Sequence, residues 1–415
     1  MTRKRVVITG MSALSPLGGN LEESWDNLLK GKSGIAPITL FDATDFASTI
    51  AGEVKNFDPE QYGIPAKQAR RMDRFVQFAV AASLMLMKDA GFTITDENAA
   101  SVGVMLGVGL GGLKTIEDFH QKLIDAGPNK ISPFMIPMLI SNMAPGQVSI
   151  FTGAKGPNVV ATSACASALH AIGYAYSELL LGRCEYVITG GVEATVTPMG
   201  ISGFTALKAL CTRNDEPEKA SRPFDRDRSG FIMGEGSGLL FVESLDSALT
   251  RGAKIYAEVA GFGSSGDAFH MTAPRDDGEG MASAMRSAIK DAGVTPDVVD
   301  HINAHGTSTQ LNDMAETKAI KTVFGKRAYD IPITANKSQT GHLLGAAGGI
   351  ESVFSAMTLK TGVIPGTANY ENPDPQCDLN YMSDGPKNIQ AEYVLCNSFG
   401  FGGTNACILY KRWDG

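Results

Sequence analysis

Leu86-Met87-Lys88-Asp89-Ala90-Gly91-Phe92-Thr93 recurs later in the chain as Ala288-Ile289-Lys290-Asp291-Ala292-Gly293-Val294-Thr295. In both copies an amphipathic helix is expected to end at the glycine. A short apolar strand then runs into small residues, over 101–112 in the first copy and 298–309 in the second. An echo this short can arise by chance, but it predicts a chain built from two similar halves.

The echo extends upstream of both helices. The opening strand Arg5–Gly10 and its Gly/Ser/Pro turn have a counterpart in Ile255–Gly266, which enters a glycine-rich turn. We therefore predict a boundary near residue 255, between an N-terminal half (1–254) and a C-terminal half (255–415). Because strands alternate with helices, we expect an α/β fold with mainly parallel sheets covered on both faces.

The composition is that of a globular α/β enzyme, with 43% hydrophobic residues, 19% charged residues and 47 glycines in 415 residues. The net charge of −8 argues against general binding of the protein surface to nucleic acid or anionic lipid. No stretch is apolar for long enough to insert in a membrane, and the basic N-terminus resembles a strand more than a signal peptide. We expect a cytoplasmic protein. The charged, proline-rich stretch 214–227 is expected to be a surface loop.

The six cysteines form no C-x-x-C pair, so reduced thiols and no metal site are expected. Cys165 follows a β-branched strand and precedes a helix. At such an elbow the helix dipole and free N–H groups favour the thiolate, which is the better nucleophile. A buried, inert thiol is the commoner role of the residue, and it is expected for the other five: Cys184, Cys211, Cys377, Cys396 and Cys407.

Two histidines lie in polar, glycine-containing turns. His305 follows the expected strand Val298–Ile302, and loops at such strand ends often carry the sites of α/β proteins. His342 lies near the start of a glycine-rich helix, whose dipole would keep the imidazole neutral. A lone histidine is usually structural. One cysteine with two histidines, however, is the minimum set for thioester chemistry with carbon–carbon bond formation.

Four segments resemble, in order, the four signatures of the β-ketoacyl synthases: Thr162–Cys165, Asn303–Thr309, Lys337–Gly348 and Asn397–Asn405. The match covers essentially the whole chain. The resemblance implies a thiolase-like fold, with two similar halves in a five-layered α-β-α-β-α arrangement, usually as a homodimer. It also implies a condensing acyltransferase of fatty acid biosynthesis, in which malonyl-acyl carrier protein and a Cys165-bound acyl chain give a 3-oxoacyl chain lengthened by two carbons.

The resemblance assigns a role to each matching residue. His305 and His342 would assist decarboxylation, the N–H groups of Cys165 and Phe401 would form the oxyanion hole, and Phe401 would gate the acyl pocket. Lys337 and Glu351 match a supporting ion pair. Thr307 and Thr309 match residues that contact the pantetheine arm, and Asp267 and Thr272 match a mobile loop opposite the gate. No tightly bound cofactor is implied, since phosphopantetheine carries the substrates. Some relatives hold a monovalent cation, and the sequence leaves open whether one lies near Asn303, Glu351 and Asn397.

An acidic carrier protein would need a basic docking patch on this acidic chain. Lys67, Arg70 and Arg71 form a basic cluster at helical spacing and match the family's patch, as do Lys130 and Lys208. Asn129 departs from the family, because relatives often carry a basic residue there. A solvated basic face without a partner is the alternative.

Two positions bear on the subclass and on the acyl pocket. Leu110 matches a position where type II enzymes carry a branched residue and type I enzymes a glycine, so type II is favoured over type I or a polyketide-type ketosynthase. Met135 lies where relatives often place phenylalanine, in contact with the partner subunit's acyl pocket. The preferred chain length is therefore open.

Two other functions fit parts of the sequence. Residues 107–112 and 261–266 both match G-x-G-x-x-G, as in a nicotinamide dehydrogenase, but no second strand ending in an acidic residue follows the helix expected over 113–126. A non-catalytic chain-length partner subunit would resemble a synthase but lack the nucleophile, and Cys165 is present.

Overall fold

Ten strands form one continuous sheet in the computed structural model, which describes residues 4–415. The sheet order is β10-β9-β13-β14-β8-β1-β7-β6-β4-β5. Five strands come from the first part of the chain: β1 (Val6–Leu14), β4 (Val102–Gly107), β5 (Asn158–Ala161), β6 (Tyr186–Glu193) and β7 (Gly236–Ser244). Five come from the second part: β8 (Ala257–Gly266), β9 (His301–Asn303), β10 (Ile333–Thr334), β13 (Tyr393–Gly400) and β14 (Thr404–Arg412). The two sets meet only where β1 pairs with β8, from Val6↔Val259 to Ile8↔Ala257.

The two sets of strands have the same topology. In each, the spatial order of the strands, numbered along the chain, is first, fifth, fourth, second and third. The second strand is parallel to the third and fourth, whereas the fifth is antiparallel to the fourth and first. The prediction of two similar halves is therefore confirmed. The prediction of mainly parallel sheets is wrong, because the fifth strand of each half runs back antiparallel beside the fourth.

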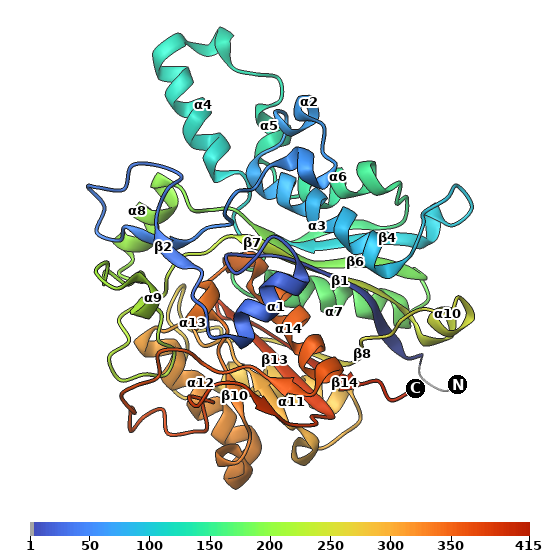
Figure 1. Cartoon of the computed structure of the whole chain (residues 1–415), viewed down its shortest axis with the longest axis vertical. Coiled ribbons are helices and arrows are strands. Elements are labelled where there is room, and N and C mark those ends of the chain that lie inside the picture. The colour runs from blue at the N-terminus through green and yellow to red at the C-terminus, as the bar shows by residue number, and fades with distance from the viewer. Residues whose placement is uncertain (1–3) are drawn as a thin grey trace.

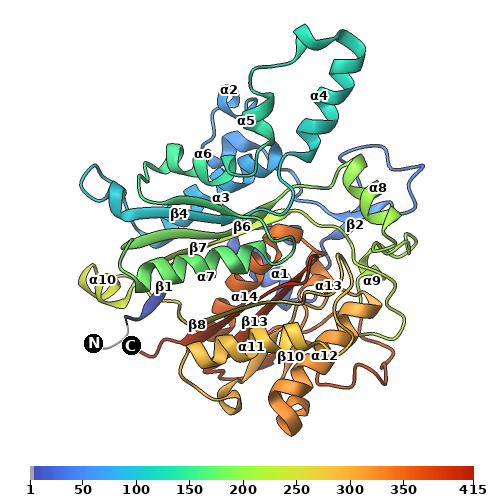
Figure 2. The same cartoon turned by 180° about the vertical axis from the view of Figure 1, so that it is seen from behind.

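Helices divide the molecule into five layers (Figures 1 and 2). The outer face of the first set is covered by α3 (Arg74–Ala90) and α6 (Met143–Thr152). Between the two sets lie α7 (Ser167–Leu180) and α14 (Ala347–Thr361), which contact strands of both. The outer face of the second set is covered by α11 (Glu279–Asp291), with α12 (Gln310–Phe324) beside it. The expected α-β-α-β-α arrangement is thus present.

The equivalent helices α3 and α11 form and end for the reasons that the sequence suggested. Buried residues of α3 recur at helical spacing, and the Asp73 side chain accepts a hydrogen bond from Phe75 N–H at its start. The chain leaves α3 at Gly91 with φ +55° and leaves α11 at Gly293 with φ +72°. Only glycine adopts this left-handed conformation without strain, so both turns are fixed by the sequence.

The predicted surface loop over 214–227 is only partly exposed, because residues 220–225 are buried. Within 214–227 the chain forms α9 (Pro217–Ala220) and then a buried segment, in which Arg222 pairs with Asp225 at 3.3 Å. Asp225 also accepts backbone N–H groups of Glu371 and Asn372. These charges are internally satisfied, so charge alone did not indicate exposure.

Shorter elements complete the fold: α1 (Leu21–Leu29), β2 (Ile35–Pro37), β3 (Ile50–Gly52), α2 (Ala66–Ala69), α4 (Leu113–Ala126), α5 (Met135–Leu139), α8 (Pro198–Ala206), α10 (Leu245–Thr250), α13 (Lys337–Thr340), β11 (Val363–Ile364) and β12 (Lys387–Asn388), with 3-10 turns η1 (Pro59–Tyr62), η2 (Ala99–Ser101), η3 (Pro128–Lys130), η4 (Pro296–Val298), η5 (Gly325–Tyr329) and η6 (Leu344–Ala346). Over residues 4–415, none of the helices has the length and apolarity needed to span a bilayer.

Candidate active site

Cys165, His305 and His342 converge between the two sets of strands. One side-chain atom from each, the sulfur or a ring nitrogen, lies within 4.8 Å of the other two. The imidazole centroids are 5.3 Å apart and the rings are nearly perpendicular, at 82°. All three side chains are buried and line one cavity of about 290 Å³. Three residues that are far apart in sequence therefore line the same cavity.

The elbow that carries Cys165 is conformationally strained. Ala164 has φ +51°, a left-handed value that is unfavourable for a residue with a Cβ. The Ser167 hydroxyl holds the turn, because it accepts a hydrogen bond from Ser163 N–H at 2.8 Å and donates one to the Ala164 carbonyl at 2.7 Å. The strain thus presents the sulfur just ahead of α7.

The state of the thiol differs from the sequence prediction. Burial raises the pKa of Cys165 to about 12, although the Lys337 charge and the backbone N–H groups of Phe401 and Cys165 lower it. The predicted effect of the elbow is present, since the N–H groups lower the pKa, but loss of hydration outweighs it and raises the pKa overall.

His305 is held from behind by Glu316 of α12. That carboxylate accepts the N–H groups of His305 at 2.9 Å and Gly306 at 2.8 Å. Burial, with the nearby Lys337 charge and His342, holds the pKa of His305 well below its usual value. Lys337 Nζ lies 3.4 Å from His305 Nδ1, which must accept from an ammonium group, so the proton of the neutral ring is on Nε2.

His342 is fixed through its backbone and through its ring. Its N–H donates to the Ile232 carbonyl at 2.7 Å, and its Nδ1 accepts from Leu344 N–H at 3.3 Å. The ring therefore also carries its proton on Nε2. Burial and the Lys337 charge hold the pKa of His342 well below its usual value. The helix dipole expected to keep this ring neutral is not the cause, since α14 begins only at Ala347.

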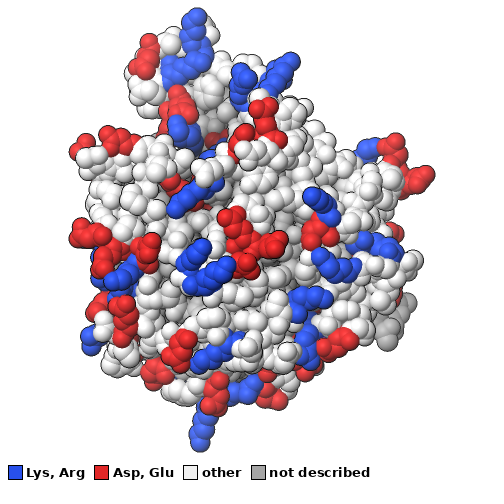
Figure 3. All heavy atoms as spheres, in the orientation of Figure 1, with Lys and Arg blue, Asp and Glu red and all other residues white. Residues whose placement is uncertain are grey.

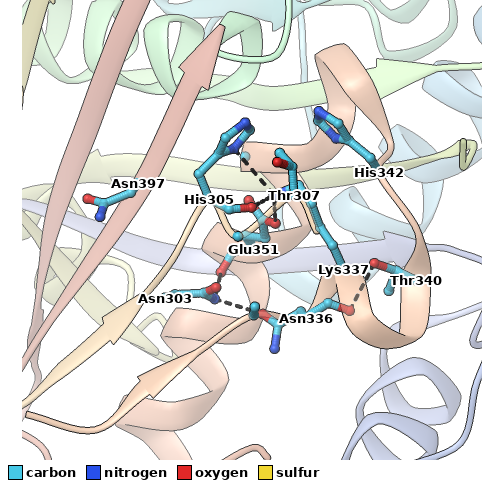
Figure 4. Close-up of polar contacts among 12 residues, drawn as sticks. Asn303, His305, Thr307, Asn336, Lys337, Thr340, His342, Glu351 and Asn397 are labelled. Atoms are coloured by element: carbon cyan, nitrogen blue, oxygen red, sulfur yellow. Dashed lines mark hydrogen bonds and ion pairs between the residues drawn. The ribbon is translucent and has the colours of Figure 1, made fainter. Parts of the chain in front are cut away.

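Lys337 and Glu351 form a buried ion pair beside the histidines (Figure 4). Lys337 Nζ lies 2.5 Å from both Glu351 Oε1 and the His305 carbonyl. Burial raises the pKa of Glu351, and the Lys337 charge opposes this shift. The pair joins α13 to α14 and places a positive charge near both imidazoles.

Comparison with known proteins assigns this arrangement to a family. Residues 3–248 match the family described as "Beta-ketoacyl synthase, N-terminal domain", and residues 256–371 match its C-terminal domain. The chain belongs to the β-ketoacyl synthase family. It is accordingly an acyl-transferring condensing enzyme.

Several full-length relatives of this synthase share one name. The protein named "3-oxoacyl-[acyl-carrier-protein] synthase 2" from Synechocystis sp. is 49% identical, and the match covers 100% of this chain and 99% of the relative. The protein of the same name from Vibrio cholerae is 48% identical, and the match covers 99% of this chain and 100% of the relative. These relatives confirm the predicted type II synthase of fatty acid biosynthesis.

Solved structures confirm the fold at lower identity. A β-ketoacyl synthase from Burkholderia phymatum superposes with a TM-score of 0.92 at 34% identity, covering 99% of this chain and 100% of the other. A ketosynthase solved with its type II polyketide acyl-carrier protein superposes with a TM-score of 0.91 at 32% identity, with the same coverage. The polyketide ketosynthase is thus less similar in sequence than the relatives named synthase 2, at 32% against 48–49% identity.

The turn between β13 and β14 closes one side of the synthase cavity. Phe401 lies in this turn, and its ring contacts Phe204 with centroids 6.3 Å apart. Asp267 and Thr272 line the cavity from a facing loop, and Gly402 N–H donates to the Met271 carbonyl at 2.8 Å. The β13–β14 turn and the loop that carries Met271 are therefore joined directly beside the cavity.

Thr307 and Thr309 line the cavity beside His305. Their hydroxyl groups lie 2.9 Å apart and share a hydrogen bond. Lys208 also lies at the cavity wall. Small polar side chains therefore border the route to Cys165.

Some predicted residues lie outside this cavity. Leu110, with 51% of its surface exposed, and Met135 do not line it. Lys67, Arg70, Arg71 and Lys130 are exposed on the outer surface. None of these six residues touches the sulfur or the imidazoles in this state.

Two buried carboxylates were missed by the sequence analysis. Glu316 holds the backbone of His305, and Glu193 accepts four backbone N–H groups beside the site. Burial raises the pKa of Glu316 to about 6 and that of Glu193 to about 7. Neither belongs to one of the four motifs. Glu316 follows His305 on the next helix, which was the available signal.

The residues around the ion pair fit the cation that some relatives hold. Several buried oxygen atoms lack a hydrogen-bond partner within residues 4–415, and four of them belong to Glu351 and to residues of the motifs: Asn303 Oδ1, Glu351 Oε2, Asn397 Oδ1 and Ser398 Oγ. Amide, hydroxyl and carboxylate oxygens suit a hard cation. A cation held by them would favour the charged form of Glu351 and hence its pairing with Lys337.

Proposed function

We propose that Cys165, His305 and His342 carry out the decarboxylative condensation of a malonyl group with a fatty acyl chain, both delivered by acyl carrier protein. The product is a 3-oxoacyl chain two carbons longer. The convergence of the sulfur and the two neutral imidazoles within 4.8 Å is the observation that carries this proposal.

The first stage transfers the acyl chain to Cys165. The sulfur attacks the acyl thioester carbonyl, a new carbon–sulfur bond forms, and the bond to the pantetheine sulfur breaks. Because the Cys165 pKa is about 12, its proton must leave as the bond forms, and it ends on the departing pantetheine thiolate. Backbone N–H groups of Cys165 and Phe401 stabilise the oxyanion.

The second stage forms the carbon–carbon bond. The malonyl carboxylate leaves as carbon dioxide, and its electron pair passes into the thioester enolate. His305 and His342 donate Nε2–H hydrogen bonds to the enolate oxygen, since each ring accepts on Nδ1. The carbanion then attacks the acyl-Cys165 carbonyl, the carbon–sulfur bond breaks, and the sulfur takes a proton from solvent.

Surrounding residues support these steps. The Lys337 charge helps to keep His305 neutral, and Glu351 holds Lys337 in place. Thr307 and Thr309 hydrogen-bond the pantetheine arm. Phe401 gates the acyl chain, with Asp267 and Thr272 on the loop opposite. Leu110 and Met135 shape the far end of the acyl pocket.

The carrier protein docks on the exposed basic residues near α2 and η3. Lys67, Arg70 and Arg71 form no ion pair with the chain between residues 4 and 415, and Arg71 lies over the Phe134 ring at 4.4 Å. Figure 3 shows basic side chains projecting from the end of the molecule that carries α2 and α4. An acidic partner would pair with these charges. Lys130 and Lys208 extend the patch towards the cavity.

The enzyme works as a homodimer in the cytoplasm. Edge strand β5 leaves Val159 47% exposed, and neighbouring apolar side chains of Ile150 and Tyr174 are exposed as well. An uncovered edge strand with an apolar border favours pairing with a second copy. All six cysteines are free thiols, which suits a reducing compartment.

Cys165→Ala tests the proposed function. The variant should lose acyl transfer and condensation, by at least about 1,000-fold, because no nucleophile remains. It should retain part of the malonyl decarboxylation, since both histidines are unchanged. Radiolabelled acyl-carrier substrates separate the two activities. Elongation by the variant at the wild-type rate would refute the assignment.

A further inference from the structure

Glu193 is a fully buried carboxylate at the end of β6 that no step above uses. Its Oε2 accepts Gly109 N–H at 2.7 Å and Gly345 N–H at 3.1 Å, while Oε1 accepts the N–H groups of Leu110 and Gly111, each at 3.3 Å. The charge is thus balanced by backbone dipoles from two segments that are distant in sequence.

The surrounding backbone is built for this carboxylate. A Cβ atom on Gly345 would lie 2.2 Å from Gly109 N, and a Cβ on Gly109 would lie 2.4 Å from Glu193 Oε2. A Cβ on Gly191 would lie 2.6 Å from the Ala168 Cβ, in the first turn of α7 after Cys165. The glycines therefore let three backbones meet around Glu193, directly behind the nucleophile.

Each segment held by Glu193 serves a different step. One carries Leu110, within the G-x-G-x-x-G stretch that resembled a nucleotide loop. The other follows Leu344, which has a strained φ of +46° and donates its N–H to His342 Nδ1. Glu193 thereby fixes the turn that sets the His342 tautomer as well as the loop that carries Leu110.

We propose that Glu193 is a positioning residue that holds the Leu110 loop and the His342 turn with one carboxylate, so that acyl-chain specificity and decarboxylation share an anchor. This inference rests on the proposed function for the roles of Leu110 and His342. A glutamine at this position replaces one acceptor oxygen with an NH₂ group, which cannot accept a hydrogen bond, so one or both segments must shift.

Glu243 offers a matched control. It is also fully buried, and it lies on β7, the strand that pairs with β6. The two glutamates lie at opposite ends of this strand pair, where Glu193 is opposite Gly236 and Glu243 is opposite Tyr186. Glu243 bonds Thr9 and Arg251, away from the site. Glu243→Gln therefore reports the cost of losing a buried carboxylate from the same pair of strands.

The experiment compares wild type, Glu193→Gln and Glu243→Gln in two assays. These are the kcat of malonyl decarboxylation and the ratio of kcat/KM for fourteen-carbon and six-carbon acyl donors. Glu193→Gln should lower the kcat about tenfold and change the ratio about fivefold, because displacements of a fraction of an ångström are costly at a reacting centre. Glu243→Gln should lower the melting temperature but leave both values within about twofold.

The outcomes separate cleanly. A Glu193→Gln enzyme that changes neither value, or only one of them, would overturn the shared anchor, as would an equal effect of Glu243→Gln. If Glu193→Gln does not fold, Glu193→Asp replaces it in the experiment, since aspartate keeps the carboxylate on a shorter side chain. Glu193→Asp should change the same two values by smaller factors. If it changes neither value, the proposal is overturned. If wild type does not condense, the proposed function itself has failed.

Discussion

The Cys165 sulfur lies where two influences on its ionisation oppose each other. Lys337 and two backbone N–H groups favour the thiolate, whereas burial and the nearby Glu193 favour the thiol, and the resulting pKa is about 12. A resting thiol of this kind does not react with every electrophile that enters. In the proposed mechanism it attacks a bound thioester and its proton ends on the departing thiolate.

Alkylation by iodoacetamide tests this state of Cys165. Below the pKa of a thiol, its thiolate fraction rises about tenfold for each pH unit. The rate of Cys165 modification should therefore rise by about tenfold per unit from about pH 7 to about pH 9 without levelling off. Mass spectrometry of the Cys165 peptide measures the rate, and circular dichroism confirms that the fold persists. A plateau near neutral pH would show that the elbow does stabilise a thiolate.

The motifs in the sequence identified Cys165, His305 and His342 but not the carboxylates behind them. The reason is physical. A nucleophile or a base needs a particular neighbourhood of small and polar residues, which leaves a local pattern. Glu193 and Glu316 act by accepting N–H groups of segments that are distant in sequence, and no local pattern encodes such a partnership.

At the scale of elements, helices were easier to predict than strands. α4 has the bounds that were expected, and α3 and α11 lead into left-handed glycines as expected. The strand expected over Val298–Ile302 instead begins at His301, because the chain first forms the turn η4 (Pro296–Val298). Strand direction was not predictable either, since the alternation of side chains is the same in parallel and antiparallel pairs.

Charge reversal tests the proposed docking patch at α2 and the residues that follow it. Lys67→Glu with Arg71→Glu should raise the KM for carrier-bound acyl substrate by about tenfold at low salt, because like charges would then face the acidic partner. Small acyl thioesters that need no docking should react at the wild-type KM. Steady-state kinetics with both substrates at low and high salt measures the effect.

A second pair of charge reversals controls for net charge. Lys88 and Lys360 are exposed lysines outside the proposed patch, at the ends of α3 and α14. Lys88→Glu with Lys360→Glu should leave both KM values unchanged. Equal effects of the α2 variant on carrier-bound and small substrates would argue for a damaged site and against a docking patch.

At the scale of the whole molecule, the site exists only where the two sets of strands face each other. Cys165 precedes α7 in the first set, whereas His305 and His342 come from the second, and α7 and α14 pack between them. Direct strand pairing between the sets is limited to β1 and β8. The central helices therefore hold the sulfur against the imidazoles. The boundary at residue 255 stays a prediction.

A second copy of the chain would complete this architecture at the exposed edge of β5. Val159→Lys should weaken the proposed homodimer, because the lysine and its symmetry mate would face each other across a twofold axis. Like charges in such a contact cost about 3 kcal/mol, which corresponds to a roughly hundredfold higher dissociation constant. Leu249→Lys is the matched control, since Leu249 is equally apolar and 58% exposed but lies on α10, away from β5. Light scattering over a dilution series should find monomers for Val159→Lys and dimers for Leu249→Lys. A stable Val159→Lys dimer would place the interface on another face, and Met135 could then not reach a neighbouring acyl pocket across β5.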